Sequence, residues 1–305
     1  MKVGYVGINH TVGCTASSTF RLKSYSLERF IAAVNNNLDC LEKTLLFNAN
    51  NDILFFRITS DLIPFASHEV LTVNWREIFR ERFRSLGKLI LDNAMRISMH
   101  PGQFTVLNSP DSSIVRQSIK ELEYHANVLD LLRLDDTAKI QVHVGGIYGD
   151  KRAGIKKFAS VYRSLPQNIT RRLAIENDGR RYSAEDCMKV YAETGIPVIF
   201  DVFHHEAFTH SISAKEGFLL CFGTWQKRDG IPMIDYSTQK AGAVPGKHAE
   251  HIDFTKFLEF INTIKPYNCD IMIEAKSKEK DALRAVELLR GDPRFAAPAK
   301  AENHF

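Results

Sequence analysis

Eight short apolar runs alternate with eight amphipathic stretches along nearly the whole chain. The runs are rich in β-branched and aromatic residues, as expected of buried parallel strands, and span residues 3–8, 53–58, 96–100, 139–144, 173–176, 197–202, 231–235 and 270–274. Between them apolar residues recur every three or four positions, which predicts helices over residues 27–47, 75–94, 113–132, 151–165, 184–194, 214–222, 254–264 and 278–290. A strand followed by a helix, repeated eight times, is the pattern of a (β/α)8 barrel, so we predict an α/β fold, a TIM barrel.

Domain organisation follows from the same alternation. No segment rich in proline, glycine and serine interrupts it, and 305 residues suit one barrel with long loops. We therefore predict a single TIM-barrel domain over residues 1–290. Residues 291–305 are rich in alanine, proline and charged residues, and we expect a flexible C-terminal tail there.

Cysteine content and hydropathy indicate a soluble, cytoplasmic protein. No run approaches the ~20 apolar residues of a membrane helix, and the apolar stretch at the N-terminus is broken by glycine, unlike that of a signal peptide. The cysteines are odd in number and form no C-x-x-C motif, so we expect reduced, mostly buried thiols. They are Cys14, Cys40, Cys187, Cys221 and Cys269. The net charge of +4 permits nucleic acid as a partner without demonstrating it.

Polar side chains stand at the carboxyl ends of the predicted strands, where TIM barrels hold their active sites. They are Asn9, Arg57, His100, His143, Glu176, Asp201, Asp235 and Glu274. Two positions earlier in several strands come small or apolar residues, Ala174, Ile199 and Met272, which should fill the barrel interior below. Gln141, below His143, needs a hydrogen-bonding partner inside the barrel.

The strand ends predict a metal site at the C-terminal face of the barrel. Carboxylates and imidazoles crowded into one barrel mouth repel each other unless cations neutralise them. The segment FDVFHHEAF adds His204 just above Asp201, and GKHAEH offers His248 and His251 on a loop over the same face. The candidate ligands are His100, His143, Glu176, Asp201, His204, Asp235, His248 and Glu274. This mixed set suits Mn²⁺, Zn²⁺, Fe²⁺ or Mg²⁺, and it is large enough for two or three clustered ions.

Two kinds of chemistry fit such a cluster. In displacement at phosphorus, one ion lowers the pKa of a water and another stabilises the leaving oxygen. In sugar isomerisation on the same kind of barrel, two ions polarise a hydroxy-carbonyl pair. The spacing of the ligands alone does not separate these alternatives.

Several longer stretches resemble the UV damage endonuclease family, which has the xylose isomerase-like TIM barrel and is related to endonuclease IV. They are GYVGINHT (4–11), FNANNDILFFRITSDLIPFASH (47–68), SMHPGQF (98–104), VHVGGIYGDK (142–151), AIEND (174–178), FDVFHH (200–205) and IEAKSKE (273–279). The likeness extends from about residue 2 to 290. SMHPGQF and LIPFASH are long and unusual enough to be specific.

The resemblance implies an ATP-independent DNA repair endonuclease. The family nicks double-stranded DNA immediately 5′ to cyclobutane pyrimidine dimers, (6-4) photoproducts and some other lesions, leaving a 3′-hydroxyl and a 5′-phosphate. It uses clustered divalent ions, often manganese, and its precedent is a monomer, which we expect here. By motif match, the ligands carry over to His100, His143, Glu176, Asp201, His204, His248 and Glu274. Of these, we expect Glu176, Glu274, Asp201 and His204 to act in catalysis.

The resemblance also implies side chains that probe the damaged duplex. Tyr5 and Asn9 match positions that contact the flipped bases, Gln103 matches a wedge residue, and Phe104 stands where a tyrosine is often found. A lesion is easier to flip than sound bases because its stacking and pairing are already poor. Arg57 is one of several basic residues near the catalytic side that could bind DNA phosphates; the others are Arg21, Lys23, Lys151, Lys240 and Lys247.

The seventh strand departs from the family pattern. The family has a Lys-x-His pair there, with a carboxylated lysine at the metals, whereas this chain has Met233 and Asp235 in the stretch PMIDYS. A thioether is a poor ligand for a hard ion, but Asp235 can coordinate directly. The number of ions is therefore open, and a non-catalytic damage-binding protein remains a third reading beside nuclease and sugar isomerase.

Overall fold

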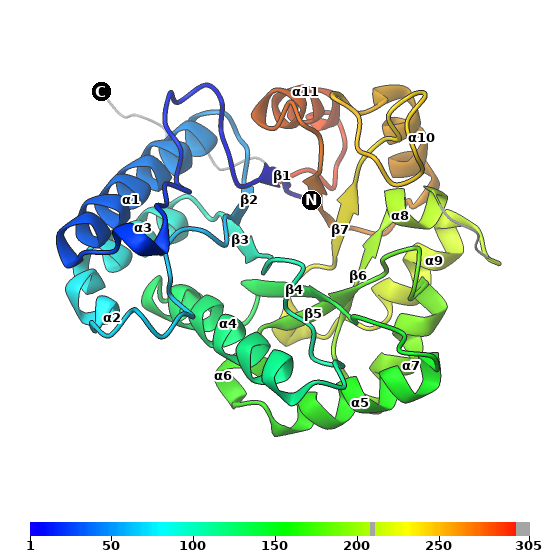
Figure 1. Ribbon diagram of the computed structural model, residues 1–305. Coiled ribbons are helices and arrows are strands. Elements are labelled where there is room, and N and C mark those ends of the chain that lie inside the picture. The colour runs from blue at the N-terminus through cyan, green and yellow to red at the C-terminus, as the bar shows by residue number, and fades with distance from the viewer. Residues whose placement is uncertain (208–210, 297–305) are drawn as a thin grey trace, which may run out of the picture.

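Eight parallel strands close into a barrel in chain order in the computed structural model, which describes residues 1–207 and 211–296 (Figure 1). The strands are β1 (Val3–Val6), β2 (Phe55–Ile58), β3 (Arg96–Met99), β4 (Lys139–His143), β5 (Leu173–Glu176), β6 (Val198–Asp201), β7 (Met233–Tyr236) and β8 (Asp270–Ile273). β8 pairs with β1, with Gly4 opposite Met272, which completes the closure. The predicted (β/α)8 barrel is confirmed.

Helices surround this barrel on the outside (Figure 1). They are α1 (Leu27–Asn50), α2 (Trp75–Ile78), α3 (Arg80–Asp92), α4 (Ser112–Leu131), α5 (Lys151–Ser164), α6 (Gln167–Thr170), α7 (Ala184–Thr194), α8 (Val202–Ala207), α9 (Ala214–Phe222), α10 (Phe254–Thr263) and α11 (Glu279–Leu289). The helix predicted over residues 75–94 is divided, because the backbone of Phe79 leaves the helical region at φ −104° and ψ 10°. Helices α6 and α8 add to the predicted pattern. None of the helices within the described residues is long and apolar enough to cross a membrane.

The barrel interior is layered. Phe55, Ala174, Ile199, Met233 and Met272 form an apolar layer, which confirms the inward positions predicted for three of them. Below it, the amino-terminal end of the barrel is closed by two buried ion pairs, Arg96–Asp270 (2.8 Å) and Lys139–Asp229 (2.6 Å). The hydrophobic strands therefore hold a polar layer at each end, and the upper one contains the predicted strand-end residues.

His125 on α4 is a neutral histidine in the core. Its Nδ1 donates to the carbonyl oxygen of Glu121 (2.7 Å), and its buried Nε2 has no partner within the described part of the chain. Burial lowers the pKa of His125 to about 4, because a proton on Nε2 would add a charge with no acceptor. Folding thus depends on this side chain staying neutral.

The structure corrects the prediction for two cysteines. Cys14, in the loop between β1 and α1, forms a disulfide with Cys40 on α1, and their Cα atoms lie 5.8 Å apart. The two are 26 residues apart in sequence, and only the folding of the loop back along α1 brings them together. The other three cysteines are free and buried, as predicted.

The C-terminal segment is held against the barrel through residue 296. Arg294 donates to the carbonyl oxygens of Tyr267 (2.8 Å) and Ile261 (3.0 Å). The backbone N–H of Ala296 donates to the carbonyl oxygen of Met1 (2.9 Å). The predicted tail therefore has an anchored first part at residues 291–296. Its remainder, residues 297–305, lies outside the described residues.

Candidate metal centre and active site

Six carboxylate and imidazole side chains meet at the barrel mouth because parallel strands of a closed barrel end at one rim. His143, Glu176 and Asp201 are the last residues of β4, β5 and β6, and Asp235 is the third residue of β7. His100 and Glu274 directly follow β3 and β8. Each of these six candidate ligands thus comes from a different strand, and the buried backbone of the barrel fixes its position.

Glu176 is the centre of this group. It is 2% exposed, and its Oε1 lies 2.8 Å from Nε2 of His100 and 3.1 Å from Nε2 of His143. Burial alone would raise the pKa of Glu176, but His143, His100 and Arg57 hold that pKa well below its ordinary value. Glu176 is therefore a carboxylate aimed at two imidazole nitrogens, which is a donor set that a divalent ion can share.

Asp201 and His204 form a second pair of donors. β6 runs directly into α8, so the Asp-x-x-His spacing places His204 above Asp201. The backbone N–H of His204 donates to Oδ1 of Asp201 (2.7 Å), and Nδ1 of His204 lies 2.9 Å from Oδ2. Burial alone would lower the pKa of His204, but the Asp201 carboxylate raises it to about 10. A metal at this imidazole must displace a proton.

His248 reaches the mouth from the loop between β7 and α10. Its Nδ1 lies 2.8 Å from Oγ of Ser237 and 2.8 Å from the carbonyl oxygen of Glu274, and its Nε2 lies 3.9 Å from Oε2 of Glu274. The nearby His251 is directed elsewhere and pairs with Asp281 at 2.7 Å. Of the two histidines in GKHAEH, only His248 joins the site.

Arg57 lies inside the barrel mouth rather than on its surface. Its Nη2 donates to Oδ1 of Asp235 (2.7 Å) and Oε1 of Gln141 (2.7 Å), and its Nη1 donates to Glu274. Gln141 in turn donates to Glu176 and to Oδ2 of Asp235, so the partner that it was expected to need is present. Burial and the neighbouring carboxylates raise the pKa of Asp235, and the Arg57 guanidinium opposes them.

The donor set fits divalent metal ions. Possible ligand atoms of His100, His143 and Glu176 lie within 4.8 Å of one another, as do those of Glu176, Asp201 and Asp235. Imidazole nitrogens with carboxylate oxygens suit first-row ions such as Mn²⁺, Fe²⁺ or Zn²⁺. The Met233 thioether lies in the apolar layer below and adds no ligand. These groups could therefore bind metal without the lysine that the family pattern expects.

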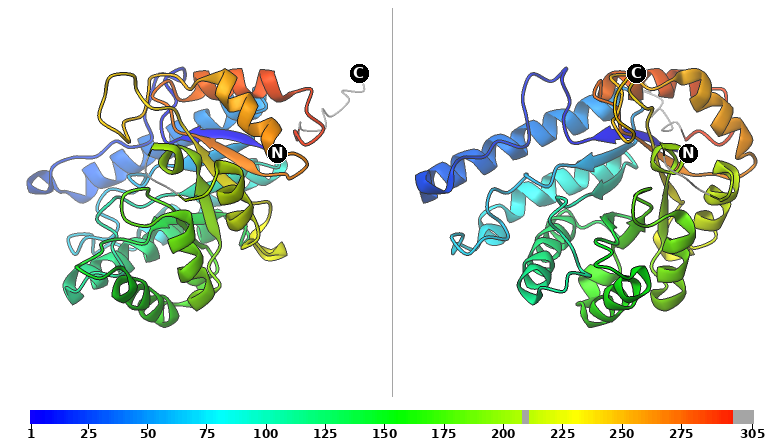
Figure 2. Two further views of the ribbon diagram at one scale, coloured as in Figure 1. Left: turned by 90° about the vertical axis from the view of Figure 1, so that its right-hand side faces the viewer. Right: turned by 45° about the vertical axis from the view of Figure 1, so that its right-hand side comes forward.

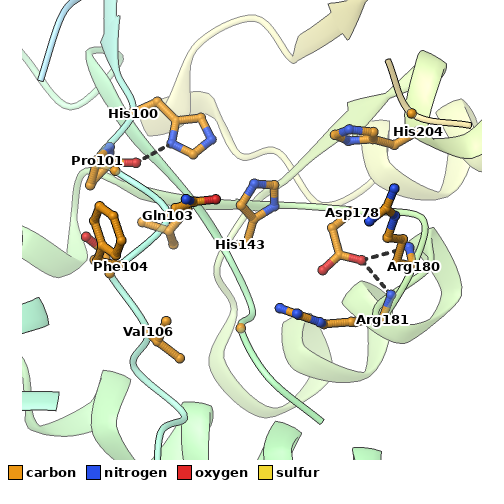
Figure 3. A pocket seen from close by; sticks show the side chains of 15 residues that line it. His100, Pro101, Gln103, Phe104, Val106, His143, Asp178, Arg180, Arg181 and His204 are labelled. Atoms are coloured by element: carbon orange, nitrogen blue, oxygen red, sulfur yellow. Dashed lines mark hydrogen bonds between the residues drawn. The ribbon is translucent and has the colours of Figure 1, made fainter. Parts of the chain in front are cut away.

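Two pockets extend outward from the mouth. One, of about 590 Å³, lies over the ligands and includes Ile8, Arg57, Glu176, Glu274 and Lys278 in its wall. The other, of about 560 Å³, is lined by residues 100–106, Asp178, Arg180, Arg181 and Gly246 (Figure 3). His100, His143 and His204 border both, so the two pockets meet at the predicted ligands.

Gln103 and Phe104 occupy one side of the second pocket. Phe104 is 82% exposed, and Figure 3 shows Gln103 extending between Phe104 and His143. Both side chains are accessible from the C-terminal face of the barrel. Their contact with DNA as a wedge stays a prediction.

Arg180 and Arg181 stand on the opposite side of this pocket and were missed by the sequence reasoning (Figure 3). The Oδ1 of Asp178 accepts from the backbone N–H groups of Arg180 (3.0 Å) and Arg181 (2.7 Å), which turns the loop after β5 toward the pocket. Nη2 of Arg180 donates to the carbonyl oxygen of Pro245 (3.2 Å) and so ties this loop to the one after β7. The available signal was the Arg-Arg pair that follows the strand-end motif AIEND after Gly179.

Tyr5 and Asn9 are buried, which gives them no surface toward a duplex. The hydroxyl of Tyr5 donates to Asn48 (2.8 Å) and accepts from Asn9 (2.8 Å). Oδ1 of Asn9 accepts from the backbone N–H groups of Thr11 (2.8 Å) and Val12 (3.1 Å). In this structure the pair joins β1 to α1 and holds the start of the loop at residues 7–26.

Comparison with known proteins shows the family of this chain. The family model of UV-endonuclease UvdE matches residues 2–302. The UV DNA damage endonuclease of Clostridium perfringens (strain 13 / Type A) is 38% identical over 292 residues, which are 95% of this chain and 71% of the relative. The crystal structure of SacUVDE matches with a TM-score of 0.90 and 44% identity over 95% of this chain and 98% of that one. Endonuclease IV from Thermus thermophilus shares the fold, with a TM-score of 0.56 and 15% identity over 82% and 93% of the two chains. This chain therefore belongs to the UvdE family of UV endonucleases and is a DNA endonuclease built on a TIM barrel.

Proposed function

We propose that this endonuclease cuts double-stranded DNA immediately 5′ to cyclobutane pyrimidine dimers and (6-4) photoproducts, leaving a 3′-hydroxyl and a 5′-phosphate. The observation that carries the proposal is the meeting of Glu176, His100 and His143 at the junction of two pockets. One pocket contains the ligand cluster and the other has exposed planar and cationic side chains on its walls. A phosphodiester at the junction would lie between ligands and DNA-contacting loops.

Catalysis would depend on divalent ions, and we propose Mn²⁺. Bound ions lower the pKa of a water and stabilise the leaving oxygen. Glu176 and Glu274 would hold them with His100, His143 and His248. Asp201 holds His204 through one contact to its backbone N–H and one to its imidazole Nδ1, so this pair would position the reacting groups and exchange a proton at Nδ1 of His204.

The lesion would be held between the walls of the second pocket. Phe104 offers an exposed ring on which an extruded base can stack, and the Gln103 amide can fill the space left in the duplex. Arg180 and Arg181 opposite would bind the backbone phosphates, with Lys240 and Lys247 on the loop after β7 beside them. Phosphate contacts carry no sequence information, which suits an enzyme that recognises distortion. We propose that it acts as a monomer and without ATP.

The test is a nicking assay with two end-labelled duplexes of one sequence, of which only one contains a single cyclobutane dimer. With Mn²⁺ and no ATP, we expect one nick immediately 5′ to the dimer. A DNA polymerase should extend its 3′-hydroxyl end, and a phosphatase should remove the phosphate from its 5′ end. The undamaged duplex should remain intact. Equal cutting of both duplexes, or cutting that EDTA does not stop, would contradict the proposal.

A further inference from the structure

A permanent positive charge lies among the carboxylates of the barrel mouth. Arg57 is 2% exposed, and its guanidinium contacts side chains from three other strands, Gln141 on β4, Asp235 on β7 and Glu274 after β8. Its backbone is fixed in β2, opposite Val6 of β1 and Ser98 of β3. The charge therefore cannot swing out to solvent without breaking several buried contacts.

The hydrogen bonds of Asp235 are already satisfied by protein. Oδ1 accepts from Arg57 at 2.7 Å and Oδ2 accepts from the Gln141 amide. A buried carboxylate with both oxygens occupied loses these bonds if it turns to a metal ion, and it leaves Arg57 with Glu274 as its remaining carboxylate partner. The other strand-seven candidate, Met233, lies in the apolar layer below. The β7 corner of the mouth is thus closed by Arg57 and Gln141.

The remaining donors form two sets. One consists of Oε1 of Glu176 with the two imidazoles that lie 2.8 Å and 3.1 Å from it, those of His100 and His143. The other consists of two pairs, Asp201–His204 and His248–Glu274, whose facing atoms lie 2.9 Å and 3.9 Å apart. Oxygens of Glu176, Asp201 and Asp235 also lie within 4.8 Å of one another, but both oxygens of Asp235 are already bound by Arg57 and Gln141.

The charge count points the same way. When Glu176, Asp201, Asp235 and Glu274 are all ionised and a metal ion has displaced the proton of His204, Arg57 reduces the four negative charges to a net −3. Two divalent ions then leave a surplus of one positive charge, which the single negative charge of a phosphodiester balances. Three divalent ions would leave a surplus of three positive charges in a mouth whose main groups are buried, and unbalanced buried charge is costly.

We propose that the Arg57 guanidinium is a built-in cation that takes the place of a metal ion at the β7 corner, so that this active site holds two divalent ions and Asp235 pairs with Arg57 instead of binding metal. The inference rests on the proposed metal-dependent function and specifies its metal complement. It assigns Arg57 a role in organising the mouth, not in contacting DNA.

The test is native mass spectrometry of the full chain loaded with Mn²⁺, which counts ions independently of cleavage. We expect two ions on the wild-type protein and on Arg57→Lys, and three on Arg57→Gln, where a further ion replaces the lost charge. Asp235→Asn should keep two ions with Mn²⁺ affinity within about threefold of wild type, because Asn still accepts from Arg57. Glu176→Gln is the matched control that should lose an ion.

Each other outcome overturns the inference. The inference fails if the wild-type protein binds three ions, if Arg57→Gln binds two, or if Asp235→Asn loses an ion. Any of these results would mean that Asp235 binds metal or that Arg57 does not exclude a third ion. If Arg57→Gln does not fold, as judged by circular dichroism, the wild-type and Asp235→Asn counts decide alone. A wild-type protein with three ions that still nicks damaged DNA would refute the inference and leave the proposed function standing, whereas a protein that binds none would refute both.

Discussion

Phe104 offers a direct way to separate lesion recognition from folding and metal chemistry. A phenylalanine side chain presents about 200 Å² when fully accessible, and at 82% exposure roughly 160 Å² of it is available to a ligand. Stacking of a base on one face would cover about half of this, or about 80 Å², which corresponds to about 2 kcal/mol at about 25 cal/mol per Å². We therefore expect Phe104→Ala to lower kcat/KM on dimer-containing duplex about 30-fold.

We expect Phe104→Ala to leave the stability of the folded state almost unchanged. Exposed side chains without specific contacts alter the free energy of unfolding by less than about 0.5 kcal/mol, so urea denaturation of Phe104→Ala should overlay that of wild type. Phe104→Tyr keeps the stacking face and should retain near wild-type nicking. Leu91→Ala is the matched control, because Leu91 is 57% exposed near the end of α3 that leads into the amino-terminal end of β3, away from the mouth.

The measurement is single-turnover nicking of a dimer-containing duplex over a range of enzyme concentrations, with binding followed in parallel. The stacking role is refuted if Phe104→Ala and Leu91→Ala nick equally fast. A loss of rate that Phe104→Tyr shares would also refute it, because the tyrosine ring stacks as well as that of phenylalanine.

Three further predictions concern the ligands, the DNA and the core. Glu176→Gln should reduce nicking by more than about 100-fold while affinity for damaged duplex in a gel-shift assay stays within about threefold; near wild-type nicking would remove Glu176 from the metal site. Arg181→Gln should weaken binding of damaged and undamaged duplex alike and lower the slope of log K against log salt by about one; an unchanged slope would place Arg181 away from the phosphates. The pKa of His125 is about 4 in the folded protein, below the roughly 6.5 of an unfolded chain, so the unfolded state binds the proton first and stability falls as pH drops from 6.5 toward 4. Urea denaturation at pH 7 and 4.5 should show an acid loss about 2 kcal/mol larger for wild type than for His125→Asn, and equal losses would contradict it.

The fold was predictable because the spacing of apolar residues and the alternation of strand-like with helix-like stretches can be read directly from the sequence. Errors arose where a single backbone conformation decides an element's end. Strand β1 ends at Val6, not at residue 8, and Gly7 turns the chain with a φ of +70°. The division at Phe79 is of the same kind. Amphipathic spacing continues through such a point and does not reveal it.

The candidate ligands were predictable for a similar reason. The carboxyl ends of all strands in a parallel barrel lie at the same rim. Recognising the strands is therefore enough to predict that His100, His143 and Glu176 meet. Side chains that interact across the barrel were not predictable, because their partners come from distant strands. Arg57 was expected among the residues that could bind DNA phosphates, but its side chain pairs with Asp235. The sequence around residue 57 contains no signal that predicts this partner. The Cys14–Cys40 disulfide was not predictable either, because only the folding of the loop back along α1 brings the two residues together.

The proposed chemistry and the proposed substrate choice rest on largely separate parts of this chain. Most candidate ligands stand at strand ends, whereas Phe104, Arg181 and residues 239–247 of the loop that Figure 2 shows protruding from the barrel lie on connections between the strands and helices. Mutations in these loops can change which distortions of the double helix are recognised, while the strand-end residues stay the same. A combinatorial library confined to residues 102–106 and 239–246 would explore new lesion preferences at little risk to folding.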